Sequence, residues 1–118
     1  MKKPVSPQHG VTFNLAAVAQ ELRSEPSYQR DGHIARTLVR TPDQRVVLIV
    51  LEGGRRMSQH QAEATASIQT ISGNIRLQLP DRPVDLAAGE LLVLGHGLEH
   101  DVEAQDESAF LLTLGWRD

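Results

Sequence analysis

Apolar residues near the start of the chain recur at the spacing of a helix. Four of them fall at i, i+3, i+4 and i+7 and share one face: Leu15, Val18, Ala19 and Leu22. Asn14 precedes them and is a good N-cap, because its short side chain can accept hydrogen bonds from exposed amides of the first turn. Pro26 disfavours helical geometry in the residue before it. The pattern therefore predicts one helix over about 14–24, after a loosely ordered lead-in over 1–12.

From about residue 33 the apolar residues alternate with polar ones, which is the period of a β-strand. Turn-forming residues divide this region into about eight short strands. We interpret 60–72 as one strand whose inner face holds His60, Ala62, Ala64, Ala66 and Ile68. With no long linker, the pattern predicts a closed or double-sheet antiparallel fold. It forms one domain over 13–118, with the strands at about 33–116.

The composition narrows the classes of function. The chain has no cysteine, which excludes disulfides, thiolate metal ligands and a cysteine nucleophile. Its formal net charge is −3 and only four residues are aromatic (two Phe, one Tyr, one Trp), so we expect no nucleic-acid partner. No apolar run follows the N-terminal lysines and the longest such run is too short to cross a bilayer. We therefore expect a cytoplasmic protein with no membrane partner.

Two glycine-bounded stretches carry the candidate chemistry. The first begins at Gly54 and ends at Gly73, with His60 after five intervening residues. The second begins at Gly89 and contains His100. Their spacing resembles the two motifs of the cupin superfamily, G-x5-H-x-H-x3,4-E-x6-G and G-x5-P-x-G-x2-H-x3-N. The chain is similar in this respect to small single-domain, RmlC-like cupins.

The resemblance implies an all-β fold, a double-stranded β-helix or jelly-roll cupin barrel, with the one N-terminal α-helix outside it. In metal-binding cupins the two motifs supply three histidines and a glutamate. At the matching positions this chain has His60, Ala62, Ala66 and His100. Two of the four ligands are thus replaced by methyl groups, so the resemblance implies a degenerate metal site.

Replacement of the two ligands favours an interior that binds a small molecule and requires no cofactor. The candidate ligand-binding residues are His60, His100, Ala62, Ala66, Ile75, Leu77 and Val102. They combine an apolar lining with two imidazoles, and small-molecule sites commonly have this composition. An imidazole can donate or accept a hydrogen bond, or hold a carboxylate when it is protonated. We therefore expect a ligand with an apolar body. An apolar metabolite that also carries an acidic group would fit this expectation.

Two other functions stay open. A metal-dependent cupin enzyme, of the dioxygenase or isomerase type, would use His60, His100 and a third, unidentified ligand to hold a divalent metal. A scaffold or interaction protein would have a barrel filled by its own side chains. No catalytic residue is assigned, and His96, in a glycine-flanked loop, is expected at the barrel mouth or the surface.

We also expect a homodimer. The strand 45–51 is apolar on both faces, so its outer face needs a cover, which could be another strand layer, the helix or a second subunit. In the last strand, Leu111 and Leu112 are adjacent and therefore point to opposite faces. Leu111 thus adds a further apolar side chain to the outer face. A symmetric partner is the commonest cover for such a surface.

Overall fold

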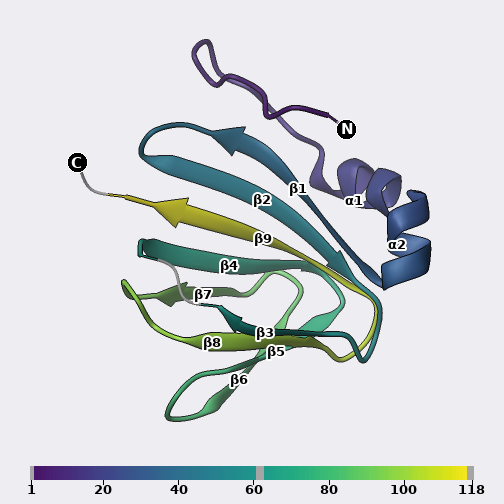
Figure 1. Ribbon diagram of the computed structural model, residues 1–118, viewed down its shortest axis with the longest axis vertical. Coiled ribbons are helices and arrows are strands. Elements are labelled where there is room, and N and C mark those ends of the chain that lie inside the picture. The colour runs from purple at the N-terminus through teal and green to yellow at the C-terminus, as the bar shows by residue number, and fades with distance from the viewer. Residues whose placement is uncertain (1, 61–62, 117–118) are drawn as a thin grey trace.

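The computed structural model describes residues 2–60 and 63–116, with only the backbone described at Gln59 and His60. Within these residues the chain forms nine strands in two antiparallel sheets that face one another (Figure 1). Two helices lie outside the larger sheet, beside β1 and β2. The architecture is therefore the all-β jelly roll that the sequence predicts.

The N-terminal region contains two helices where the pattern predicts one. Helix α1 spans Leu15–Arg23, and the Asn14 side chain accepts a hydrogen bond from the Ala17 amide at 3.1 Å. Helix α2 spans Pro26–Asp31. Pro26 ends the first helix and also begins the second, because its fixed φ and missing N–H suit the first helical turn. Pro26 thus marks both the end of one helix and the start of another. The sequence prediction uses it only as the end of the first helix.

The larger sheet has the strand order β1-β2-β9-β4-β7. In that order its strands are His33–Arg40, Gln44–Leu51, Ser108–Gly115, Thr65–Ser72 and Leu91–Leu94. The smaller sheet has the order β3-β8-β5-β6. Its strands are Arg56–His60, His100–Ala104, Asn74–Gln78 and Pro83–Ala87. Because neighbours in each sheet are mostly distant in sequence, the chain crosses repeatedly between the sheets and closes the barrel.

The stretch 60–72 is not one strand, which corrects the sequence interpretation. β3 ends at His60 in the smaller sheet, and β4 begins at Thr65 in the larger one. Apolar alternation continues across the change of sheet, because the inward positions of both sheets carry apolar residues. Within β4 the prediction holds, since Ala66, Ile68 and Thr70 are buried. Ala62 lies outside the described residues.

The main core fills the space between the sheets, and a second cluster lies outside the larger sheet. The core includes Ile49, Leu51, Ile68, Ile75, Leu77, Leu94, Val102 and Phe110. In the outer cluster, Leu22 of α1 and Tyr28 of α2 lie with Leu48 and Val50 of β2. The helices therefore cover part of the outer face of 45–51, and a helix is one of the three covers that the sequence leaves open for it.

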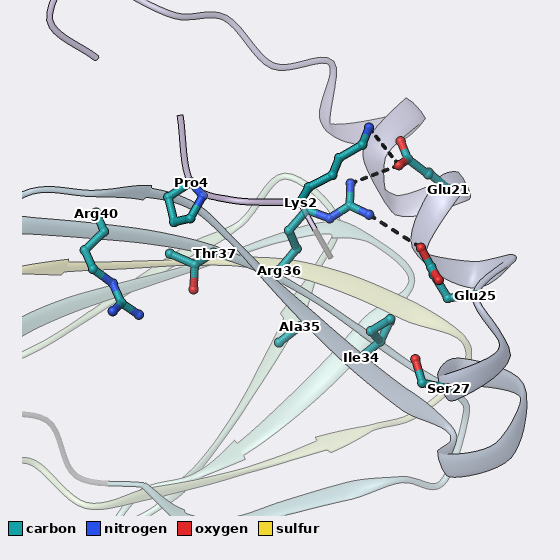
Figure 2. A pocket seen from close by; sticks show the side chains of 10 residues that line it. All are labelled: Lys2, Pro4, Glu21, Glu25, Ser27, Ile34, Ala35, Arg36, Thr37 and Arg40. Carbon is teal, nitrogen blue, oxygen red and sulfur yellow. Dashed lines mark ion pairs between the residues drawn. The ribbon is translucent and has the colours of Figure 1, made fainter. Parts of the chain in front are cut away.

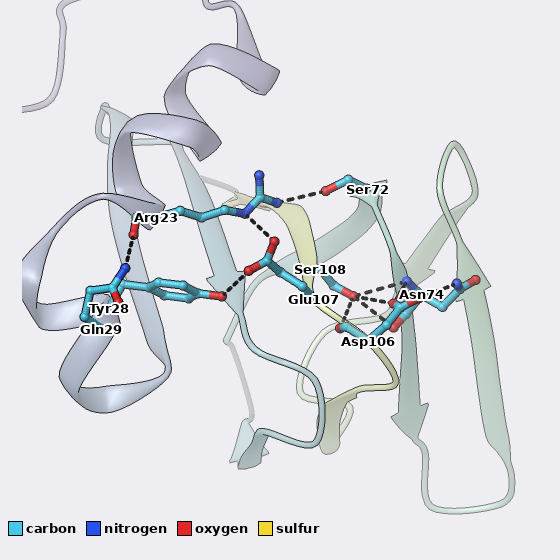
Figure 3. Close-up of polar contacts among 8 residues, drawn as sticks. All are labelled: Arg23, Tyr28, Gln29, Ser72, Asn74, Asp106, Glu107 and Ser108. Atoms are coloured by element: carbon cyan, nitrogen blue, oxygen red, sulfur yellow. Dashed lines mark hydrogen bonds and ion pairs between the residues drawn. The ribbon is translucent and has the colours of Figure 1, made fainter.

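A polar network joins the helices to the turn between β8 and β9 (Figure 3). Glu107 in this turn accepts a hydrogen bond from the Tyr28 hydroxyl at 3.1 Å, and its other oxygen lies 3.4 Å from Nε of Arg23. Arg23 also donates from Nη2 to Ser72 at 3.2 Å. The contacts connect both helices to the same end of the barrel.

This network predicts an unusual titration of Tyr28. Burial, followed by the hydrogen bond to Glu107, raises the pKa of Tyr28 to about 12 from its ordinary value of 10.0. The chain has one tyrosine, so ultraviolet absorbance reports this group alone. We expect the folded protein to form tyrosinate only near pH 12. Because the folded-state pKa is raised, the stability it contributes is complete below pH 10 and is lost as the pH rises through 12.

Substitution of Glu107→Gln should lower the tyrosine midpoint, because it removes the negative charge that opposes ionisation. Glu103→Gln, on the smaller sheet, is the matched control and should leave the midpoint unchanged. A midpoint near 10.0 in wild-type protein that is still folded by circular dichroism would show that the contact does not form.

Candidate functional site

His100 is the first residue of β8 and points to the buried side of the strand. Its exposed fraction is 7%, and Val102 and Ala104 on the same face are also buried. Its Nδ1 lies 3.2 Å from the carbonyl oxygen of Leu98. When Nδ1 carries the proton and donates to this carbonyl, Nε2 becomes the nitrogen with the lone pair. The contact therefore orients the ring and selects the tautomer.

His60 is the register partner of His100. β3 pairs with β8, and beyond an irregularity after Met57 the Cα atom of His60 lies opposite that of His100. Directly opposed residues of antiparallel strands project to the same face of a sheet. The register thus makes the two motif histidines neighbours within one sheet. The position of the His60 side chain lies outside the described part of the structure.

Four other predicted ligand-binding residues lie in the core between the sheets. Ala66, Ile75, Leu77 and Val102 each have an exposed fraction of 3% or less. Leu77 of β5 is paired with Val102 of β8, two positions from His100. The fold therefore brings these residues into one apolar interior with His100. Whether they touch a ligand stays a prediction, as it does for Ala62, which is not among the described residues.

A small cavity opens beside His100. It has a volume of about 170 Å³ and is lined by Gln78, Leu79, Pro80, Glu99, His100 and Asp101. Drug-sized ligands occupy pockets of roughly 300 Å³ or more, so this space suits the end of a small molecule. Asp101 forms an ion pair with Arg56 at 2.7 Å. The partner guanidinium therefore offsets the negative charge of one of the two lining carboxylates.

Sequence reasoning did not identify Gln78, Leu79 or Glu99 as part of this site. Gln78 belongs to β5, and it reaches His100 because β5 pairs with β8, with Gln78 opposite Asp101. Neither motif contains residues of β5. Only the assignment of that strand pair from the sequence would have revealed Gln78 and Leu79, whereas Glu99 is the sequence neighbour of His100 in the second motif.

The motif positions do not fit a resident metal ion. Ala62 and Ala66 have no atom that can coordinate a metal, and catalytic sites generally need three protein ligands. Among the side chains that the structure describes, which do not include that of His60, no group of three or more His, Cys, Asp or Glu residues is placed to hold one. The Ala66 side chain is instead packed in the core. The motif histidines alone would give a weak site.

His96 lies in the turn that precedes β8. The Leu98 amide donates to the Gly95 carbonyl at 3.2 Å across this turn, and the His96 side chain is exposed. His33 is likewise exposed at the start of β1. Neither histidine lies in the buried interior with His100.

A larger cavity of about 690 Å³ lies on the outside of the larger sheet, beneath the N-terminal segment (Figure 2). Arg36 of β1 forms ion pairs with Glu21 at 3.2 Å and Glu25 at 3.8 Å, and Lys2 pairs with Glu21 at 2.9 Å. The hydrogen bond to Lys2 and the nearby Arg36 lower the pKa of Glu21. Because these charges offset one another within the chain, the cluster fastens the helices and the N-terminal segment to β1.

The fold is that of known cupins. A cupin superfamily protein from Desulfitobacterium hafniense is 13% identical, with a TM-score of 0.71 over 74% of this chain and 80% of its own. A conserved protein of unknown function from Streptococcus pyogenes is 20% identical, with a TM-score of 0.74 over 100% of this chain and 97% of its own. A cupin 2 conserved barrel domain protein from Leptotrichia buccalis is 26% identical, with a TM-score of 0.75 over 88% of this chain and 47% of its own.

No family model matches the sequence, and no curated protein matches it. The two-sheet topology, the motif histidines on paired strands and these structures together show a small cupin-fold domain. The RmlC-like double-stranded β-helix is its architecture. Neither helix in the described ranges has the length and apolar character needed to cross a membrane.

Proposed function

We propose that this cupin-fold domain binds a small, mostly apolar molecule at the end of the barrel where residues 60 and 100 are paired. The supporting observation is His100, a buried imidazole oriented by the Leu98 carbonyl and placed beside a cavity. With Nδ1 donating to the Leu98 carbonyl, Nε2 of the neutral ring can accept a hydrogen bond from a ligand hydroxyl, and Nε2 of the protonated ring can donate to a ligand carboxylate. We therefore expect the ligand to carry one polar group of this kind.

The apolar body of the ligand would lie against the interior side chains. Ala66 stands where metal-binding members of the superfamily place a carboxylate, so the chain has a methyl group in place of a longer polar side chain. Leu77 and Val102 are buried apolar residues on the paired strands that lead from the cavity into the core, and neither lines the cavity itself. An apolar wall with one oriented polar group is the usual composition of a small-molecule site.

Native mass spectrometry of untagged protein, purified without harsh washing, tests the proposal. We expect a species that is heavier than the 13.0 kDa chain by the mass of one small bound molecule. This molecule should be lost on denaturation. His100→Ala should lose the adduct, whereas the surface variant His96→Ala should keep it. Absence of any adduct, together with no thermal stabilisation by a library of small acids and alcohols, would refute the proposal.

Elemental analysis of the same preparation addresses the metal-dependent alternative. Near-stoichiometric iron, manganese, nickel, copper or zinc that disappears in a His60→Ala/His100→Ala double variant would favour that alternative. Substoichiometric metal that does not respond to the double variant would favour the metal-free site.

A further inference from the structure

An arginine lies on the inner side of the larger sheet. The register aligns one row of directly opposed residues across four strands: Arg45–Leu114–Ala66–Leu94. Opposed residues project to the same face, and Ala66 and Leu94 belong to the core between the sheets. Val47, the next residue of β2 on the face of Arg45, belongs to this core as well. Arg45 therefore points to the interior side of the sheet.

This row lies at the end of the barrel that carries the motif histidines. Residue 60 ends β3, and β4 begins at Thr65, next to Ala66. β7 ends at Leu94, and a short turn leads from it to His100 at the start of β8 (Figure 1). Both connections are shorter than the long strands of the larger sheet. The row of Arg45 and the paired residues 60 and 100 are therefore at the same end.

The charge of Arg45 is not neutralised within the described part of the chain. Each of the other arginines described there forms an ion pair with a carboxylate, with the exception of Arg40. Arg40 is the register partner of Arg45 on β1, so the two side chains leave adjacent strands on the same side. Figure 2 shows the Arg40 guanidinium apart from the ion pairs of Arg36. Like charges opposed on neighbouring strands are destabilising, so an anion between them would relieve a repulsion.

The Arg45 guanidinium also has an unmet hydrogen bond. Its Nε is buried and has no acceptor among the described residues. The carboxylate of Asp43, in the turn before β2, accepts a hydrogen bond from the Thr41 hydroxyl at 2.8 Å. Burial of a polar N–H group without an acceptor costs free energy, and more so when the group is charged. This end of the barrel therefore holds a charged donor that an external acceptor would satisfy.

Trp116 restrains the same guanidinium. Cζ of Arg45 lies 5.7 Å from the centre of the Trp116 ring, within the range of a cation–π contact. The Trp116 amide donates to the Asp43 carbonyl at 2.9 Å, which fastens the end of β9 to the β1–β2 turn. A restrained arginine loses less conformational freedom when it binds an anion. Its planar fork of N–H donors matches a carboxylate, which it can hold by two parallel hydrogen bonds.

We propose that Arg45, with Arg40 beside it, binds the carboxylate of the ligand, so that the barrel takes small organic acids in preference to the corresponding alcohols. This inference rests on the proposed small-molecule site and names its ligand class. A hydroxyl would satisfy the orphaned Nε but would leave the charge of the arginines uncompensated. A carboxylate satisfies the donor and neutralises charge, and such charge-assisted hydrogen bonds are the stronger kind.

Trp116 is the only tryptophan, so its fluorescence reports on this site directly. The full chain is titrated with straight-chain acids of about four to eight carbons and with the matching alcohols, and calorimetry gives the affinities. We expect the acids to bind about tenfold more tightly than the alcohols, or more, and to change the Trp116 fluorescence as they saturate.

Three variants assign this preference to Arg45. Arg45→Met keeps the apolar stem of the side chain and should abolish the preference for acids. Arg45→Lys keeps the charge without the planar fork and should retain only part of it. Arg30→Gln, exposed on α2 near the opposite end of β2, removes the same charge and should bind as the wild type does (Figure 1). Circular dichroism checks that each variant is folded.

The outcomes separate this inference from the site on which it rests. Equal affinity for acids and alcohols, or a preference that survives Arg45→Met in folded protein, would overturn the role of Arg45 and leave the small-molecule site standing. Binding of neither series would overturn the site and this inference with it. Inorganic phosphate tests for a simple anion site. If it binds as tightly as the acids, and equally well in His100→Ala, the arginines do not serve a ligand of the barrel and the inference is overturned.

Discussion

Substitution of Gly73→Ala is expected to lower the free energy of unfolding by at least about 3 kcal/mol, or to prevent folding. Gly73 has a φ of +78°, a conformation that residues with a side chain rarely adopt. A Cβ atom at this position would clash with the Glu107 carbonyl oxygen and the Ser108 hydroxyl. The carbonyl belongs to the backbone of the β8–β9 turn, so it cannot move without displacing that turn.

The clash matters because this turn is held against the β4–β5 turn. The Asn74 amide donates to Asp106 at 2.8 Å and to the Ser108 hydroxyl at 3.1 Å (Figure 3). Ser108 also donates to the Asn74 carbonyl at 3.0 Å. The two turns therefore form one closely packed end of the barrel. This packing leaves no space for a methyl group at position 73.

Gly54→Ala is the matched control. Gly54 also has a positive φ, +85°, but apart from the glycine and its two chain neighbours no described atom lies within 4 Å of the position that its Cβ would take. Its cost is therefore only the backbone strain, about 1–2 kcal/mol. Urea unfolding followed by circular dichroism measures both variants. Equal losses of stability at the two positions would contradict the packing of the turns.

The second large effect is a gain of metal binding in Ala62→His/Ala66→Glu. If the motif positions keep the geometry of metal-binding cupins, the double variant surrounds one point with three imidazoles and a carboxylate. Affinity for nickel or zinc should rise on the order of 100-fold or more over wild type, measured by calorimetry on untagged protein. Because residue 66 is buried, an unpaired glutamate there should destabilise the metal-free protein, and metal should restore its stability.

Ala62→His/Ala64→Glu separates ligation from simple burial of a carboxylate. Ala64 is also buried, with an exposed fraction of 2%, but it is not a ligand position of the motif. This control should lose stability without rescue by metal. Equal metal affinity in the two double variants, or binding that survives a further His100→Ala change, would show that the motif positions do not converge.

The strand pattern and the motif histidines could be predicted from sequence because they depend on local periodicity and spacing. The alternation of β4 and β8 fixes which side chains are buried, and it holds in both strands. The change of sheet after His60 could not be predicted in this way. Inward residues are apolar on either sheet, so the pattern does not change where the chain crosses.

The surroundings of His100 depend on pairing between distant strands. Gln78 lies beside Asp101 only because β5 and β8 are neighbours, and no local property of either strand specifies that pairing. The outer face of the larger sheet poses the same problem. The sequence predicts that 45–51 needs a cover, but which part the helices take follows from how α1 and α2 pack. The extent of that cover is therefore visible only in the folded chain.

The most direct test of the binding site is a titration of ¹⁵N-labelled imidazoles by nuclear magnetic resonance, with small aliphatic acids and the matching alcohols as probes. The chain has five histidines, so the exposed His33 and His96 serve as internal references. The predicted result is that the His60 and His100 signals shift together and saturate at one ligand concentration, while the reference signals stay constant. Movement of the reference histidines alone, or no saturable shift at His100 with any probe, would contradict a binding site at this end of the barrel.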